Sequence, residues 1–103
     1  MQEIERIQKM ELALNELSKS QMALSAALED LSQHQAQLKA LSAYYSSEDF
    51  RHDLALDEAG KLPIDLKRGV LSEDAVYDLM TDLTELASQM HRVSDELLTN
   101  LKP

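Results

Sequence analysis

The residues best suited to chemistry stand close together in the stretch SEDFRHDLALDE, which covers residues 47 to 58. Asp49 lies three residues before His52, and a helix brings residues at that spacing onto one face. Asp53 and Asp57, four residues apart, meet in the same way. Carboxylates and imidazoles bind divalent metal ions and also transfer protons. This pattern supports the hypothesis of a metal-assisted or acid/base enzyme.

A single helix is nevertheless a poor scaffold for a metal site. It supplies few ligands, and the sequence identifies no side chain that would orient the imidazole of His52. A charged helix face in contact with water explains the same residues more simply. We therefore predict no metal site and keep four residues only as candidate ligands: Asp49, His52, Asp53 and Asp57.

Other catalytic and cofactor motifs are missing from the sequence. The chain has no cysteine, which excludes disulfides, thiolate metal sites and a cysteine nucleophile. It contains no glycine-rich phosphate loop, no nucleophile elbow and no paired zinc motif. His34 and His91 stand alone, without a companion motif. We predict no catalytic residue and no cofactor.

The composition favours one all-α domain. The 103 residues fit a single domain, which we place at 1–103. Hydrophobic residues make up 44% of the chain but aromatic residues only 4%, and tryptophan is absent. A core must therefore consist mainly of aliphatic side chains, as in helix against helix packing.

The first half of the chain reads as one long helix, from about residue 2 to 45. Apolar residues alternate at steps of three and four, which is a heptad pattern. Neither glycine nor proline occurs before residue 60, so we expect the helix to run without a break. Gln21, Gln35 and Ser42 occupy the remaining core positions. The apolar set is Ile7, Met10, Leu14, Leu17, Leu24, Leu28, Leu31, Leu38 and Tyr45.

The end of the chain predicts a second heptad helix, from about residue 73 to 101. Ser72 is a suitable N-cap, and Glu73 and Asp74 follow in the first turn, where carboxylates favour the helix dipole. The apolar set is Val76, Leu79, Leu83, Leu86, Met90, Val93 and Leu97.

A short helix and a turn connect the two heptad segments. Ser46 or Ser47 can cap a helix over about residues 47–59, which stops at Gly60 in a left-handed conformation. Residues 60–71 then form the turn. Pro63 suits the start of a small helical turn, which Gly69 closes in the same way. Leu71 precedes the Ser72 cap and is placed to pack on the last helix.

The two long helices predict an antiparallel helical hairpin that oligomerisation completes to a bundle. If they pack antiparallel, the last helix reaches back only to about residue 16. The first turns then carry an apolar stripe without a partner, which is typical of an interface. We predict a homodimer or a higher homo-oligomer, with the interface at Ile4, Ile7, Met10 and Leu14.

The charge is acidic and uneven. Ten Lys and Arg against nineteen Asp and Glu give a net charge of -9, which disfavours direct contact with nucleic acid or anionic membranes. Residues 72–103 hold two basic and seven acidic side chains. Their acidic face is either solvated or a docking surface for a basic protein, and mimicry of nucleic acid is a further alternative. No signal segment or membrane-spanning run is evident, so we expect a cytoplasmic protein.

The central block resembles a known family signature. Residues 44–80, YYSSEDFRHDLALDEAGKLPIDLKRGVLSEDAVYDLM, are similar to an uncharacterised family of small bacterial helical proteins catalogued only as a domain of unknown function. Phe50 stands where that family often has tryptophan. The resemblance implies a bacterial helical protein and supplies no activity, substrate or partner. The matching positions are Gly60, Leu62, Pro63, Asp65, Leu66, Gly69, Val70, Leu71, Ser72, Glu73, Asp74, Tyr77 and Asp78.

The turn within this block allows two interpretations. It can be a recognition knob for a partner, or its residues can serve the backbone of a tight reversal, with Asp65 and Asp74 as caps or as ion-pair partners of Arg68. The residues concerned are Gly60, Pro63, Asp65, Lys67, Arg68, Gly69, Ser72, Asp74 and Tyr77.

Two functions from different classes therefore stay open. The first is a small helical interaction or scaffold protein that acts through its helix surfaces and its turn. The second is the enzyme that would use the cluster in residues 49 to 57.

Overall fold

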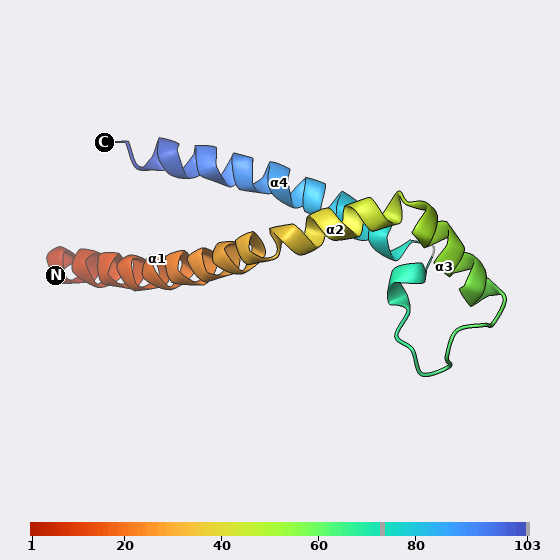
Figure 1. The fold of residues 1–103 in the computed structure, drawn as a ribbon. Coiled ribbons are helices and arrows are strands. Elements are labelled where there is room, and N and C mark those ends of the chain that lie inside the picture. The colour runs from red at the N-terminus through yellow and green to blue at the C-terminus, as the bar shows by residue number, and fades with distance from the viewer. Residues whose placement is uncertain (73, 103) are drawn as a thin grey trace. The chain divides into compact units, whose positions relative to one another are not determined.

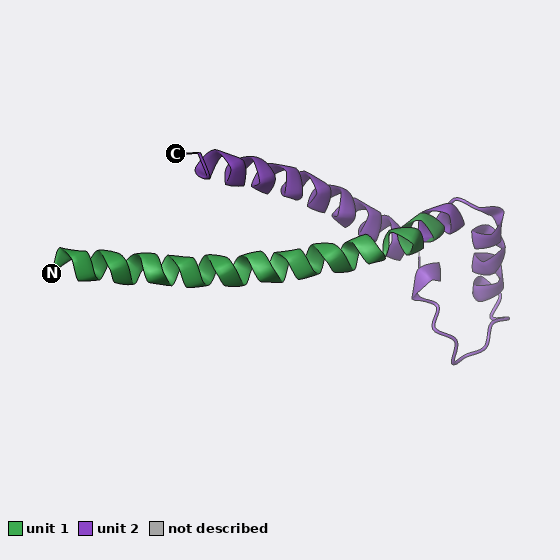
Figure 2. Cartoon of the chain, turned by 60° about the vertical axis from the view of Figure 1, so that its left-hand side comes forward, with its two compact units in different colours: residues 1–40 green, residues 41–103 purple. Residues whose placement is uncertain are grey.

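The computed structural model describes residues 1–72 and 74–102. All regular elements in these residues are helical. The chain divides into two compact units, residues 1–40 and residues 41–103 (Figure 2). The prediction of an all-α fold is confirmed, with the long helices at the two ends of the chain (Figure 1).

Within the described residues, four α-helices and one 3-10 helix follow one another. They are α1 (Gln2–Gln33), α2 (Gln35–Tyr45), α3 (Glu48–Glu58), η1 (Gly69–Leu71) and α4 (Ala75–Asn100). None of the described helices is both long enough and apolar enough to cross a membrane.

The first long helix is interrupted at His34, which corrects the prediction of an unbroken helix over residues 2–45. The backbone N–H of His34 donates to the carbonyl of Leu31, at 3.1 Å, rather than to that of Asp30. The Asp30 carbonyl instead lies 2.7 Å from His34 Nδ1, which must carry the proton because a carbonyl oxygen can only accept. Gln35 Nε2 donates to the Leu31 carbonyl at 3.2 Å. Two polar side chains thus compete with the regular backbone bonds, a known cause of helix distortion.

The short helix α3 (Glu48–Glu58) lies within the predicted range of about 47–59, and Ser47 and Gly60 mark its ends as expected. Ser47 Oγ accepts the backbone N–H of Phe50 at 3.2 Å, as an N-cap does. At the other end Gly60 has φ 67°, the left-handed conformation expected of it. The N–H groups of Gly60 and Lys61 donate to the carbonyls of Asp57 and Leu56, at 3.0 and 2.9 Å. This pair of bonds is a Schellman motif.

The turn that follows differs from the predicted helical turn. The N–H of Leu66 donates to the carbonyl of Pro63 at 3.2 Å, which closes a four-residue turn. Gly69 does not adopt the expected left-handed conformation: of the two glycines, Gly60 has a positive φ and Gly69 does not. Gly69 instead begins the 3-10 helix η1.

The start of the last helix also needs correction. Ser72 ends η1, with its N–H donating to the carbonyl of Gly69 at 3.1 Å, and is not the N-cap of α4. The N-cap is Asp74, whose side chain makes no capping bond. The prediction for Glu73 lies outside the described residues. Leu71 is therefore too far from the cap for the expected staple, although it is buried.

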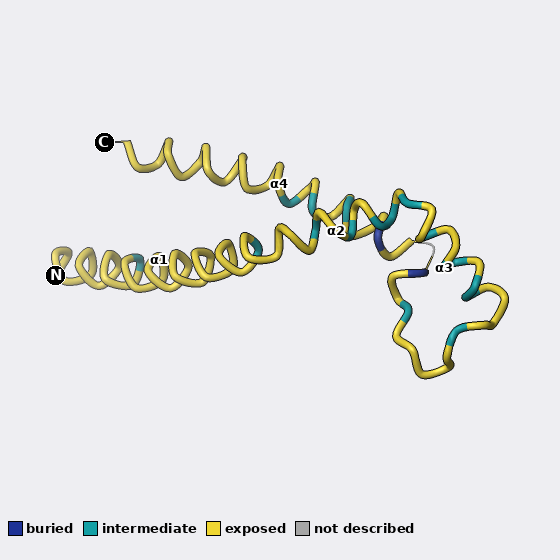
Figure 3. The backbone as a smooth tube through the Cα atoms, viewed as in Figure 1, coloured by how far each residue is buried: buried dark blue, intermediate teal, exposed yellow. Residues whose placement is uncertain are grey.

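The buried core of the described residues is very small. Leu71 of η1 is 6% exposed and Val76 of α4 is 3% exposed, and they are the two buried hydrophobic residues (Figure 3). η1 contacts both α3 and α4. This small core lies in the second unit, where η1 contacts α3 and the start of α4. By contrast, α1 has no buried residue in its 32 positions.

Candidate functional site

The residues that sequence reasoning singled out as chemical lie in the second unit, around α3 and the turn after it. The aromatic residues at the end of α2 hold the start of α3. The rings of Tyr44 and Phe50 meet edge to face with centroids 5.5 Å apart, and those of Tyr45 and Phe50 are 5.1 Å apart. Such contacts stabilise a pair beyond the burial of its area. Phe50 is thus the centre of a three-ring cluster.

A short hydrogen bond ties the same cluster to the next turn of α3. The hydroxyl of Tyr44 donates to Asp53 Oδ2 at 2.6 Å. This hydrogen bond, with smaller contributions from burial and from the charges of Asp53 and Asp49, raises the pKa of Tyr44 to about 12. At neutral pH Tyr44 is therefore a proton donor and not a base. Asp53 is engaged as its acceptor.

Ser47 joins the two helices through its hydroxyl. Its Oγ donates to the carbonyl of Tyr44 at 2.6 Å and accepts the N–H of Phe50 at 3.2 Å. The backbone N–H of Ser47 also reaches the Tyr44 carbonyl, at 3.0 Å. One residue thereby satisfies the end of α2 and the beginning of α3.

An ion pair closes the turn after α3. Arg68 Nη1 lies 2.9 Å from Asp57 Oδ1, and both side chains are more than two thirds buried. Arg68 Nη2 also donates to the carbonyl of Ile64, at 3.4 Å. The sequence offered Asp65 and Asp74 as partners for this arginine, and the structure gives Asp57 instead. The positive charge of Arg68 thus serves to hold the turn.

The four candidate metal ligands do not share one site, because their side chains have different surroundings. Asp53 bonds to Tyr44 and Asp57 pairs with Arg68, while Asp49 and His52 are exposed. Among the described residues no three His, Cys, Asp or Glu side chains form a group that could hold a metal ion. The metal-assisted or acid/base enzyme stays an alternative hypothesis of the sequence, and no observation among the described residues favours it.

The outer part of the turn presents apolar and basic side chains to solvent. Ile64 is 94% exposed and Leu66 is 47% exposed, and Lys61, Asp65 and Lys67 are exposed as well. Pro63, Gly69, Ser72, Asp74 and Tyr77 are exposed too. The contacts of Arg68 with Asp57 and Ile64 thus hold the turn together, while its outermost residues are accessible to solvent.

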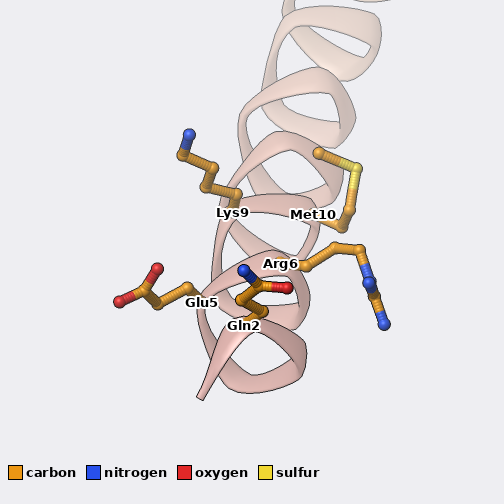
Figure 4. Close-up of a pocket in the computed structure, with 5 residues that line it drawn as sticks. All are labelled: Gln2, Glu5, Arg6, Lys9 and Met10. Atoms are coloured by element: carbon orange, nitrogen blue, oxygen red, sulfur yellow. The ribbon is translucent and has the colours of Figure 1, made fainter.

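The predicted interface residues lie on α1, in the first unit. Ile4, Ile7, Met10 and Leu14 are between 48% and 62% exposed. A surface hollow at the start of the helix is lined by this one helix only. Of the residues that line it, Glu5 and Lys9 point to one side of the helix and Arg6 and Met10 to the other (Figure 4). No enclosed pocket forms there.

Exposed apolar residues are not confined to the first turns of α1. Leu17 is 67% exposed, Leu24 52% and Leu28 43%, so the heptad seam of α1 is accessible well beyond residue 16. On α4, Leu79, Met90, Val93 and Leu97 are exposed as well. The predicted interface stripe is therefore part of a longer exposed seam.

Comparison with known families gives one match. The family described as Domain of unknown function (DUF4298) matches residues 7–93. This chain belongs to that family. The match confirms the resemblance of the central block. The search of curated proteins found no match, and the search of solved structures found none either.

The DUF4298 match covers the turn, the small core and most of both heptad helices. Sequence reasoning missed the Tyr44–Asp53 bond and the Asp57–Arg68 pair, which are nine and eleven residues apart. One signal was available: both carboxylates follow Phe50 along α3 at helical spacing, beside the tyrosine pair and the turn. Which of the acids accepts from which donor depends on the path of the chain.

Proposed function

We propose that this DUF4298 protein is a helical interaction and scaffold protein, which works by burying the exposed seams of its long helices in a homo-oligomer, in the simplest case a homodimer. The observation that carries the proposal is α1 itself. It follows a heptad pattern from Ile7 onward, and none of its 32 residues is buried. Helices in proteins draw most of their stability from packing an amphipathic face, and this face has no cover within its unit.

The exposed seam of α1 supports the same proposal. Leu14, Leu17, Leu24 and Leu28 are 60%, 67%, 52% and 43% exposed. An exposed apolar stripe of this kind is typical of an interface.

The finer arrangement in the proposal comes from the sequence register. We propose that α1 and α4 are antiparallel partners in the assembled bundle, since both carry the same three and four alternation. A protein partner at the exposed turn is compatible with this arrangement. A cytoplasmic location and a bacterial source stay predictions of the sequence.

Two leucines of α1 provide a matched test. Leu12 and Leu14 are 59% and 60% exposed in the single chain. Leu14 belongs to the seam, whereas Leu12 lies on the opposite face of the heptad. If the seam is an interface, Leu14→Asp dissociates the oligomer because it buries a charge, and Leu12→Asp leaves the oligomer intact. The mass in solution, measured by sedimentation equilibrium, distinguishes the two.

Equal behaviour of the two variants would contradict the proposal. Circular dichroism at the concentration of the experiment serves as the control for helix content. A wild-type protein that stays monomeric at all concentrations would contradict the proposal directly.

A further inference from the structure

The residues beside the apolar seam of α1 carry a second pattern. With Ile7 at heptad position a, positions e and g flank the seam. From residue 12 to 33 these positions hold only alanine or serine, in six of six cases, while all four charged residues of the span lie at b, c or f. The flanking residues are Ala13, Ser18, Ser20, Ser25, Ala27 and Ser32, and the charged residues are Glu16, Lys19, Glu29 and Asp30.

Helix propensity does not explain this distribution. Alanine is the best helix former, but serine is distinctly poorer, and four of the six flanking residues are serine. A helix selected only for stability in water would also place long charged residues at these positions, as this helix does at Glu16, Lys19, Glu29 and Asp30. The common property of the six flanking residues is small size.

Small flanks indicate two neighbouring helices and not one. In a two-stranded coiled coil, positions e and g lie at the rim and typically carry Glu and Lys that pair between the strands. In a bundle, a core-facing helix is covered beyond a and d, so that its flanks must admit another helix. The small residues that flank the seam from residue 13 to 32 are typical of a helix in a bundle.

The structure shows that this register is unbroken. α1 is one continuous helix from Gln2 to Gln33, so no break shifts the flanking residues away from the seam. Ser32 is the last of them, and the break at His34 follows. Of the six, five are exposed and Ala13 is intermediate. Nothing within the first unit covers these flanks.

One chain does not contain enough long helices to cover both flanks. A neighbour along residues 13–32 must be about 30 Å long. Among the described helices α4 has 26 residues and meets this length, whereas α2 and α3 have 11 residues each and reach about 17 Å. At most one flank can therefore be covered from within a chain. The other needs a helix from a second molecule.

We propose that two copies of this chain form a four-helix assembly in which both small-residue flanks of α1, over residues 13–32, are covered, with the second copy supplying the helix that one chain lacks. The inference rests on the proposed function, since it specifies how the oligomer is built.

Three adjacent residues test it. Ser25, Ala26 and Ala27 occupy positions e, f and g, and all three are exposed in the single chain. Each is replaced by glutamate in turn. We expect Ser25→Glu and Ala27→Glu to raise the dissociation constant of the dimer at least about tenfold, because each puts a charge between helices. Ala26→Glu is the matched control, and its dissociation constant should stay within about threefold of wild type.

Single cysteines give a second measurement with little disturbance of folding. The natural chain has no cysteine, so Ser25→Cys, Ala26→Cys and Ala27→Cys each carry one thiol. At a concentration where the protein is dimeric, thiols at 25 and 27 should react with a maleimide at least about tenfold more slowly than the thiol at 26. Dilution below the dissociation constant should make the three rates equal.

The outcomes separate this inference from the proposed function. If either flank variant assembles as tightly as Ala26→Glu, or either flank thiol reacts as fast as the one at 26, the two-flank arrangement is wrong. A dimeric wild-type protein would still support the proposed function. A wild-type mass other than that of two chains would overturn the four-helix assembly.

Discussion

At the scale of single residues, two carboxylates of α3 each hold a side chain from another segment. Asp53 accepts from Tyr44 before the helix, and Asp57 pairs with Arg68 after it. The sequence placed these acids correctly on one short helix, because local caps at Ser47 and Gly60 define it. It could not assign their partners, since a contact across nine or eleven residues depends on how the chain reverses.

The Tyr44 bond predicts a specific pH dependence. The pKa of Tyr44 is raised to about 12 from 10.0, so folding favours the neutral phenol. Its contribution to stability is complete below pH 10 and is lost as the pH rises toward 12. The tyrosinate absorbance of wild type minus that of Tyr44→Phe should show one group ionising near pH 12.

Two neighbouring acids serve as controls for this titration. Asp53→Asn should bring the pKa of Tyr44 back toward its ordinary value, because the hydrogen bond to the carboxylate is the main cause of the shift. Asp49→Asn should lower it less, since Asp49 acts only through its charge. An equal effect of the two changes would contradict the assigned bond.

The Asp57–Arg68 pair should contribute measurably to holding the turn. A double-mutant cycle with Asp57→Asn and Arg68→Gln should give a coupling free energy of about 0.5–1 kcal/mol, because the pair is more than two thirds buried and in direct contact. Urea unfolding at one fixed protein concentration measures it. Lys67→Gln, next to the arginine and exposed, is the control and should change stability little. Strict additivity of the two substitutions would argue against the pair.

At the scale of elements, glycine and capping residues predicted the short helix well and the turn poorly. Gly60 has the left-handed conformation expected of a helix end, but Gly69 does not. The two glycines look alike in sequence, each after a charged segment. The backbone bonds from Leu71 to Arg68 and from Ser72 to Gly69 reveal the 3-10 helix that takes the place of a second helix end.

These two glycines make a matched pair of substitutions. A methyl group at either position would meet no atom within 4 Å, so any difference comes from the backbone alone. Gly60→Ala should destabilise the protein by about 1–2 kcal/mol, because φ is 67°. Gly69→Ala should be neutral, or should stabilise by up to about 1 kcal/mol through the unfolded chain. Thermal unfolding of both variants measures this, and equal losses would contradict the assigned conformations.

The break at His34 was not predictable from propensity or periodicity. Neither glycine nor proline marks it, and the heptad pattern continues through it. It arises because His34 and Gln35 direct their side chains to the carbonyls of Asp30 and Leu31. Side-chain bonds of this kind depend on rotamers that the pattern does not determine.

Removal of the imidazole should restore the regular helix. In His34→Ala the N–H of residue 34 becomes free to donate to the Asp30 carbonyl, which joins α1 and α2. Nuclear Overhauser contacts between residues 30 and 34 should then show the four-residue spacing of an α-helix. Gln33→Ala is the control, since Gln33 contacts only the Glu29 carboxylate, at 3.5 Å, and should leave the break in place. A break that persists in His34→Ala would show that the imidazole does not cause it.

At the scale of the whole molecule, the long helices present more apolar seam than their own units cover. Leu71 and Val76 are the buried hydrophobic residues, whereas large apolar residues of α1 and α4 are exposed along both helices. Heptad periodicity predicted these faces from sequence. It could not say which helices cover them, because a three and four repeat fits an intramolecular and an intermolecular partner equally well.

Sedimentation equilibrium of the unmodified protein at micromolar concentrations tests the assembly most directly. We expect a mass of two chains of 11.6 kDa, which falls to that of one chain in Leu14→Asp and stays unchanged in Leu12→Asp. A single-chain mass for the unmodified protein, with full helix content by circular dichroism, would contradict it.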